Sequence, residues 1–278
     1  MAQTPSEYTP HGEIPASHVI HLSRGETVKV IDGHLQKLDL ATDSVVEDLG
    51  PVSPEDAAAT DPFTHAQVLR QQHGFVSAVE FDGYTPTAPL EHIQSLHTTW
   101  VVPEYPADRS IFICVWNGLS GGALQPVVYY WSATQKYYLW PWAFIAGRYV
   151  NGPSKVADPG LEVTGYVEYL GRDGDGYRYK EGFVGYPELD FTVTRTAEQG
   201  PADGVIVCTE DRGVPVEKWP PNPKVAMKDI KVTMQSGYIA PESLSWVAGG
   251  ERRPTPSGKN TVIVNSSSQK GVVDFYFH

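Results

Sequence analysis

The sequence predicts an all-β protein, a two-sheet antiparallel β-sandwich of the jelly-roll kind with a short helical and hairpin N-terminal extension. Turn formers are abundant, with 26 Gly and 23 Pro among 278 residues. Aromatic residues, which favour strands, make up 11% of the chain and include 7 Trp and 15 Tyr. Strand-like runs follow one another at nearly even spacing from Phe75 to the C-terminus, as is typical of sandwiches and barrels.

The chain divides into two parts of different character. Residues 1–75 hold six of the nine His and begin with a polar, Pro-rich stretch. Short strand-like runs follow, and Asp32-Gly33 between two of them indicates a two-residue hairpin turn. We therefore expect an N-terminal extension over residues 1–75 and a sandwich domain over residues 76–278.

The end of the extension carries helix signals. Ser53 followed by Pro54 is typical of a helix N-cap with proline in the first turn. Asp61-Pro62 is a second such signal, and Gly74 would end the helix that it starts. The sequence thus predicts two short helices before the sandwich domain.

The rest of the chain reads almost entirely as strands, separated by turn residues. The expected strands cover residues 76–84, 97–103, 110–118, 124–132, 136–144, 161–170, 177–186, 189–196, 204–210, 228–234, 260–267 and 271–278. Residues 172–176, Arg-Asp-Gly-Asp-Gly, lie between two tyrosine-rich runs and predict a hairpin loop.

The charge balance argues against nucleic acid as a partner. The formal net charge is −12, and an acidic chain repels phosphate backbones. No run approaches 18 apolar residues, so no membrane span is expected. The N-terminus has neither the basic nor the apolar region of a signal peptide. We therefore expect a cytoplasmic protein, or a secreted one whose signal has already been removed, and the oligomeric state stays open.

The motifs that could hold a metal are incomplete. Asp173 and Asp175 resemble half of a calcium loop, but the glutamate that would complete it is missing. His18 and His21 would point to opposite faces of an extended segment. Cys114 and Cys208 lie in apolar runs without metal-type neighbours, and we expect buried free thiols, with a single disulfide as the alternative. No metal and no cofactor is predicted.

Aromatic residues are densest between Tyr129 and Phe144. In a strand, alternate members of such a run face opposite sides, so one set fills the core and the other lines a second face. Rows of aromatic side chains on a sheet bind flat ligands such as sugars or peptides. The candidates for substrate contacts are Trp116, Tyr138, Trp140 and Trp142.

A glutamine and a glutamate stand out among the apolar runs. Gln125 follows Leu124 at the start of one expected strand, and Glu210 ends another. A carboxylate can take a proton from water, and an amide N–H can stabilise the oxyanion that forms. Gln125 and Glu210 are therefore the candidate catalytic residues, provided that the two strands bring them to one place.

These pieces resemble the eqolisins, the glutamic peptidase family. The similar segments, in order, are residues 76–84, 98–103, 115–118, 123–125, 138–142, 205–211, 225–230 and 271–277. The resemblance implies a concanavalin-like sandwich with Gln125 and Glu210 on its concave sheet, Glu210 as general base and then acid, and Gln125 as the oxyanion donor. It covers residues 76–278, and it implies a removable propeptide for residues 1–75.

Three functions compete at this stage. The first is a glutamic-type endopeptidase, which would work best at low pH because a free carboxylate has a pKa of about 4.3. The second is a non-peptidase enzyme, such as a cyclase, isomerase or hydrolase, acting on a small molecule on the same scaffold. The third is a β-sandwich without catalysis that binds carbohydrate or peptide in its aromatic cleft. The expected partner is accordingly a peptide or a small-molecule ligand.

Overall fold

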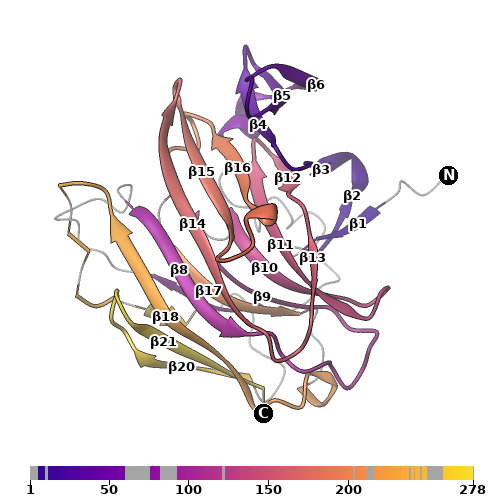
Figure 1. Ribbon diagram of the computed structural model, residues 1–278, viewed down its shortest axis with the longest axis vertical. Coiled ribbons are helices and arrows are strands. Elements are labelled where there is room, and N and C mark those ends of the chain that lie inside the picture. Colours follow the sequence, from indigo (N-terminus) through magenta and orange to yellow (C-terminus); the bar gives the residue numbers. More distant parts are fainter. Residues whose placement is uncertain are drawn as a thin grey trace.

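The computed structural model shows a β-sandwich, and the all-β prediction is confirmed (Figure 1). The structure describes residues 6–9, 12–59, 76–81, 93–120, 123–202, 204–211, 216–237, 239–240, 242–244, 246–248 and 259–277. None of the described helices is long and apolar enough to cross a membrane.

The larger sheet, sheet I, contains nine described strands, and all of their pairings are antiparallel except that of β12 with β3. Its order is β19 (Trp246–Ala248), β7 (Val76–Phe81), β17 (Val205–Asp211), β9 (Ile113–Leu119), β10 (Leu124–Trp131), β11 (Lys136–Ile145), β12 (Arg148–Asn151) and β3 (Val19–His21), and β13 (Lys155–Ala157) also pairs with β11.

The second sheet, sheet II, contains seven described strands and packs on one face of sheet I. Its order is β16 (Phe191–Arg195), β15 (Gly176–Phe183), β14 (Glu162–Asp173), β8 (Ile93–Val101), β18 (Lys224–Met234), β21 (Gly271–Phe277) and β20 (Lys259–Asn265). Short 3₁₀ turns cover Ala16–His18, Pro187–Leu189 and Val216–Lys218.

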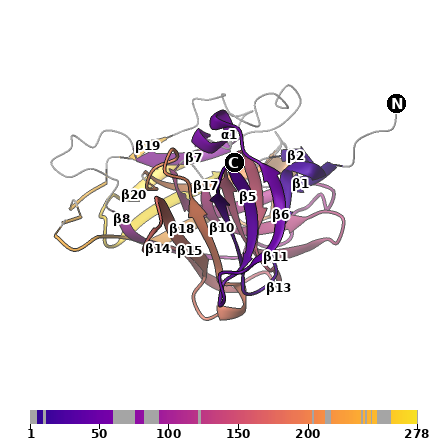
Figure 2. The ribbon, with the colours of Figure 1, turned by 90° about the horizontal axis from the view of Figure 1, so that it is seen from above.

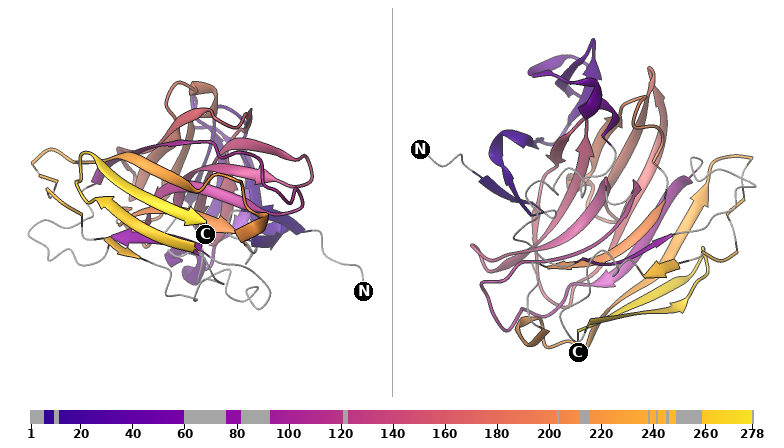
Figure 3. Two further views of the ribbon diagram at one scale, coloured as in Figure 1. Left: turned by 90° about the horizontal axis from the view of Figure 1, so that it is seen from below. Right: turned by 180° about the vertical axis from the view of Figure 1, so that it is seen from behind.

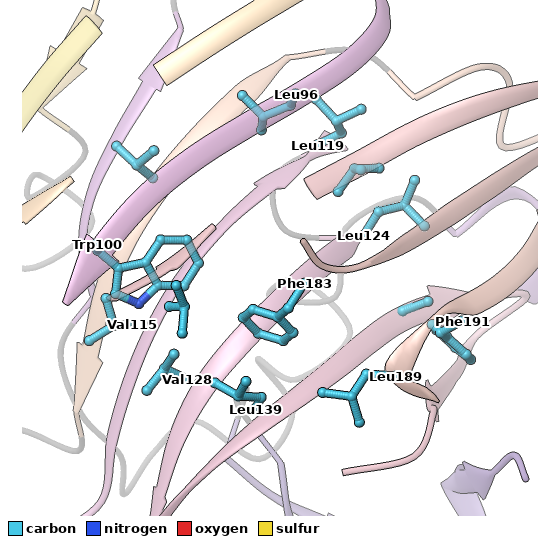
Figure 4. Packing of buried hydrophobic residues seen from close by; sticks show 14 of the residues in the cluster. Leu96, Trp100, Val115, Leu119, Leu124, Val128, Leu139, Phe183, Leu189 and Phe191 are labelled. Carbon is cyan, nitrogen blue, oxygen red and sulfur yellow. The ribbon is translucent and has the colours of Figure 1, made fainter. Parts of the chain in front are cut away.

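Sheet I buries side chains on both of its faces. Its inner face packs on sheet II around residues such as Trp100, Val128 and Phe183 (Figure 4). Its opposite face, here called the aromatic face, carries a separate buried cluster. The members of that cluster are Phe112, Cys114, Trp116, Ala123, Val127, Tyr129, Trp142, Phe144, Tyr149, Ile206 and Cys208, joined by Ile14 and Val19. Because strand residues alternate between faces, β9, β10 and β11 are buried over nearly their whole length.

Two prolines face each other in the centre of sheet I. Pro126 of β10 pairs with Pro141 of β11. On its other side, β10 pairs with β9 at Leu124 and again from Val127, and the pairing skips Gln125 and Pro126. Proline has no N–H to give to a ladder, so the pairing is interrupted where β10 carries Gln125.

The N-terminal part packs against the sandwich and adds a strand to sheet I. It contains β1 (Ser6–Thr9), β2 (Gly12–Pro15), β4 (Glu26–Ile31), β5 (His34–Asp39), β6 (Val45–Pro51) and α1 (Pro54–Ala58). Strand β3 extends sheet I beside β12, and β4 packs against β16. Figure 3 shows these indigo strands at the opposite end of the molecule from the yellow strands β20 and β21, and Figure 2 looks onto the N-terminal end.

Most local predictions for this part are confirmed. Asp32 and Gly33 both have positive φ, 50° and 76°, and join β4 to β5, as a primed hairpin turn requires. The Ser53 side chain accepts a hydrogen bond from the Asp56 amide and caps α1. The second predicted helix lies outside the described residues.

Candidate functional site

Gln125 and Glu210 lie on the same face of sheet I, the aromatic face. Trp116 on β9 donates its indole Nε1–H to Oε2 of Glu210 at 3.4 Å. A Cβ placed on Gly118 would lie 3.4 Å from Cζ3 of that indole and 3.4 Å from Cβ of Gln125. The side chains of Gln125, Trp116 and Glu210 therefore share one surface, and β9 runs between the strands of the other two.

The strand register nevertheless separates the two candidate catalytic residues. Glu210 stands opposite Cys114 of β9, whereas Gln125 lies beside Gly118, four residues further along that strand. At the usual strand rise and spacing, this offset is about 13 Å along β9 and about 10 Å across it. The Trp116 indole lies between them, with Nε1 toward Glu210 and Cζ3 toward Gly118. This register does not favour one water shared by both side chains, and the catalytic roles stay predictions.

Glu210 is set among thiols and aromatic rings. Its side chain is almost buried, with the residue 6% exposed. Cys114 faces it from β9, and Cys208, two residues back on β17, points to the same face. Both cysteines are buried and neither forms a disulfide, which confirms the prediction of buried thiols that are not paired with each other. A carboxylate in such apolar surroundings depends strongly on the donors near it, and the Trp116 indole N–H is one of them.

The predicted substrate-contact residues fall into a buried and an accessible group. Trp116 and Trp142 are 0% and 1% exposed. Trp140 and Tyr138 are partly exposed, as is Trp131, and the Trp131 ring lies 5.9 Å from Tyr138 and 6.3 Å from Trp140. The Trp140 Nε1–H donates to the Gly152 carbonyl at 2.9 Å, which fixes the orientation of its ring. A ligand that reaches the aromatic face would meet these three rings first.

Trp131 was not among the predicted residues, although alternation along β10 places it on the face of Val127 and Tyr129. From Gln125 onward, every second residue of this strand faces the same side, and this alternation is the sequence signal that could have identified Trp131.

Glu181 is the second residue that sequence reasoning missed. It lies on β15, two residues from Tyr179 and two from Phe183, so its side chain faces the same side as theirs. Both of those residues belong to the inner core. The residue is 1% exposed, and neither carboxyl oxygen has a hydrogen-bond partner in the described structure. Burial raises the pKa of the Glu181 carboxyl well above its ordinary value, and the nearby Gln125 main-chain N–H offsets only part of that effect.

The side chains of the two sequence motifs that resemble metal sites make other contacts. Asp173 forms an ion pair with Lys29 at 2.5 Å and accepts a hydrogen bond from Thr194. His21 contacts Asn151 and Glu7, each at 2.9 Å. Among the residues that the structure describes, no group of three or more His, Cys, Asp or Glu side chains could hold a metal ion.

Comparison with known proteins gives likeness in fold alone. No family model and no curated protein matches the chain. Scytalido-glutamic peptidase with a peptide-based transition-state analogue is similar at 12% identity and a TM-score of 0.46, over 74% of this chain and 98% of that one. The same peptidase with a transition-state analogue inhibitor is similar at 11% identity and a TM-score of 0.47, over 74% of this chain and 98% of that one.

A third similar structure is SCP-B, a member of the eqolisin family of peptidases, in complex with the tripeptide Ala-Ile-His. Its identity is 12% and its TM-score 0.40, again over 74% of this chain and 98% of that chain. These three similar structures are all described as glutamic peptidases or as a member of the eqolisin family. At this identity the likeness does not extend to residue roles.

Proposed function

We propose that the protein is a glutamic-type hydrolase of amide bonds that works on the aromatic face, with Glu210 as its acid and base. The observation that carries the proposal is the 3.4 Å contact between Glu210 and the Trp116 indole N–H, on a face lined with aromatic rings. A carboxylate beside an N–H donor is the pair that attack by water on an amide requires.

The proton transfers follow from this placement. The Glu210 carboxylate takes a proton from water while the water oxygen bonds to the amide carbon. The Trp116 N–H turns from the carboxylate to the oxyanion that forms. The protonated Glu210 then gives its proton to the nitrogen as the C–N bond breaks, and a carboxylic acid and an amine leave.

Gln125 has a different part in this scheme from the one that the sequence suggested. An extended peptide rises about 3.3 Å per residue, so four or five residues span the offset between Gln125 and Glu210. We assign Gln125 to binding of the substrate main chain at a distance from the reacting bond. Trp131, Tyr138 and Trp140 would bind the substrate on the accessible side.

The test is hydrolysis of a denatured protein between pH 3 and pH 8. Glu210→Gln should lower kcat about 100-fold or more, which is the usual effect of losing a general base. Gln125→Ala should act mainly by raising KM. Glu168→Gln is the matched control, because Glu168 is a surface carboxylate whose side chain is 43% exposed. Wild-type rates in the Glu210 variant would refute the proposal.

The second candidate is an enzyme for a small apolar molecule, and burial is the observation that favours it. Gln125 and Trp116 are 0% exposed, which suits a closed pocket better than a groove for polypeptide. Native mass spectrometry of the purified protein distinguishes the two. A bound apolar molecule, released when the protein unfolds, together with no peptide cleavage at any pH, would favour this candidate.

A further inference from the structure

The N-terminal part supplies side chains to both hydrophobic clusters of the sandwich. Four of them belong to the core between the sheets, and each is at most 8% exposed: Ile20, Leu22, Val28 and Leu35. Two more, Ile14 and Val19, belong to the cluster on the aromatic face. Removal of this part would therefore bring apolar side chains of both clusters into contact with water, which is unfavourable.

The same part also completes one edge of sheet I. Val19 of β3 stands beside Tyr149 of β12 in a parallel pairing. The Leu22 N–H donates to the Asn151 carbonyl at 2.8 Å, and the His21 ring contacts the Asn151 side chain at 2.9 Å. Without β3, the main-chain groups of β12 that pair with it would lose these partners and become a sheet edge.

A turn after β16 holds the far end of the N-terminal part against the aromatic face. The Thr196 hydroxyl donates to the Ala57 carbonyl at 2.6 Å. The buried Gln199 side-chain amide donates to the Ala59 carbonyl at 2.7 Å and to the Phe144 carbonyl of β11 at 3.4 Å. Ala59 packs against the aromatic cluster, to which Phe144 belongs. Gln199 thus joins the N-terminal part directly to a strand of the aromatic face.

Acid would break few of these contacts, because most of them join neutral groups. Lys29 and Asp173 form the one oppositely charged pair among them. Burial would raise the pKa of Asp173, but the hydrogen bonds from Lys29 and Thr194 outweigh it and hold that pKa below its ordinary value. The ionised partner of His21 is Glu7, which belongs to the same N-terminal part. The attachment is therefore expected to persist at mildly acidic pH.

We propose that residues 12–59 are a permanent part of the folded protein, which ends the aromatic face beside β12, and are not a propeptide that leaves to open the site. The inference departs from the removable propeptide that the resemblance to glutamic peptidases implies for residues 1–75. It does not rest on the proposed function, because attachment can be measured without substrate. For the proposed function, its consequence is that the full-length chain is the working form.

The direct test cuts the chain without removing anything from it. A recognition sequence for a specific protease is inserted directly after Ala59 in the full-length protein, and the cut protein is passed over a size-exclusion column at pH 7 and at pH 4. The fragment that ends at Ala59 should co-elute with the sandwich at one copy each at both pH values. A fragment that separates from a folded sandwich at either pH overturns the proposal.

Two variants of the cut protein test whether the described packing holds the fragment. Val28→Asp places a carboxylate at a position that is 0% exposed in the inner core, and it should lose the fragment or the whole fold. Val45→Asp is the matched control, since Val45 on β6 is 54% exposed, and it should keep the fragment. A fragment that stays bound equally in both variants would contradict the proposal.

Unfolding of the uncut protein gives a second test that needs no insertion. Hydrogen–deuterium exchange, read by mass spectrometry at increasing urea, should show residues 26–39 losing protection at the same urea concentration as residues 124–145. An earlier, separate transition of residues 26–39 would contradict a permanent attachment.

Activity separates this inference from the proposed function. The uncut and the cut protein should hydrolyse a denatured protein at equal rates. A rate that appears only after the fragment has been removed overturns the inference and leaves the proposed function standing. If neither form hydrolyses anything, the proposed function fails, and the co-elution result still decides the attachment.

Discussion

Glu210 and Glu181 are two buried glutamates in different sheets, Glu210 on the aromatic face of sheet I and Glu181 on the strand β15 of sheet II. Glu210 is 6% exposed, faces a Trp116 N–H and lies among aromatic rings. Glu181 is 1% exposed, lies in the core between the sheets and has no hydrogen-bond partner for either oxygen in the described structure. The first has an indole N–H at hydrogen-bond distance, and the second has no hydrogen bond among the described residues. Burial alone therefore does not identify a working acid.

The largest expected effect compares tryptophans on the two faces of sheet I. Trp142 on the aromatic face is 1% exposed, and Trp100 in the inner core is 0% exposed. Either one changed to Ala should lower the free energy of unfolding by about 3–5 kcal/mol, because each leaves a large cavity. Chemical denaturation measures both. A loss below about 1 kcal/mol for Trp142→Ala would mean that the aromatic face is not a second core.

The next effect is the pH dependence of stability that Glu181 confers. Its pKa is raised in the folded protein, so the native state holds the proton more tightly than the unfolded chain does. Its contribution is fully present below the unfolded pKa of about 4.3 and is lost as pH rises through the folded pKa. Glu181→Gln should match wild type near pH 4 and be more stable at pH 8 by about 1–3 kcal/mol.

Thermal unfolding at the two pH values measures this difference, and Glu168→Gln is again the control. A Glu181→Gln variant that gains nothing at pH 8 would show that Glu181 ionises in the fold without penalty, which would remove the contrast with Glu210.

The smallest effect concerns the attachment of the N-terminal part. Lys29 of β4 pairs with Asp173 at 2.5 Å, and the two side chains are only 20% and 27% exposed. Lys29→Met should cost about 0.5–1 kcal/mol in unfolding free energy. Lys155→Met, which breaks a pair with Glu188 at 47% and 41% exposure, should cost less than about 0.5 kcal/mol. Equal losses would mean that the contact between β4 and sheet II adds nothing to an ordinary surface pair.

Local sequence signals were sufficient for much of the fold. The hairpin at Asp32-Gly33 and the cap at Ser53 need only their own neighbours, and both formed as predicted. The short strands β12, β13 and β19 were not predicted. Each has only three or four residues, and their pairing depends on neighbouring strands of the sheet rather than on their own pattern.

The sequence could predict which face of the sheet carries the candidate site, but not the strand register that sets the distance between its residues. Alternation along β10 puts Gln125 on the face of Val127, and alternation along β17 puts Glu210 on the face of Cys208; both of those neighbours belong to the cluster on the aromatic face. Their separation depends on which residues of β9 stand opposite each partner strand, and no local pattern in the sequence encodes that pairing. Glu181 was discoverable, because it occupies a core position of an alternating strand, where an acid is unexpected.

The central claim is that Glu210 on the aromatic face acts as the acid and base in amide hydrolysis. Its most direct test is the single-turnover rate of peptide-bond cleavage, measured in Glu210→Gln and in Glu168→Gln. The account predicts a loss of about 100-fold or more in the first variant and none in the second. Equal rates in the two variants, with wild-type protein active, would contradict it.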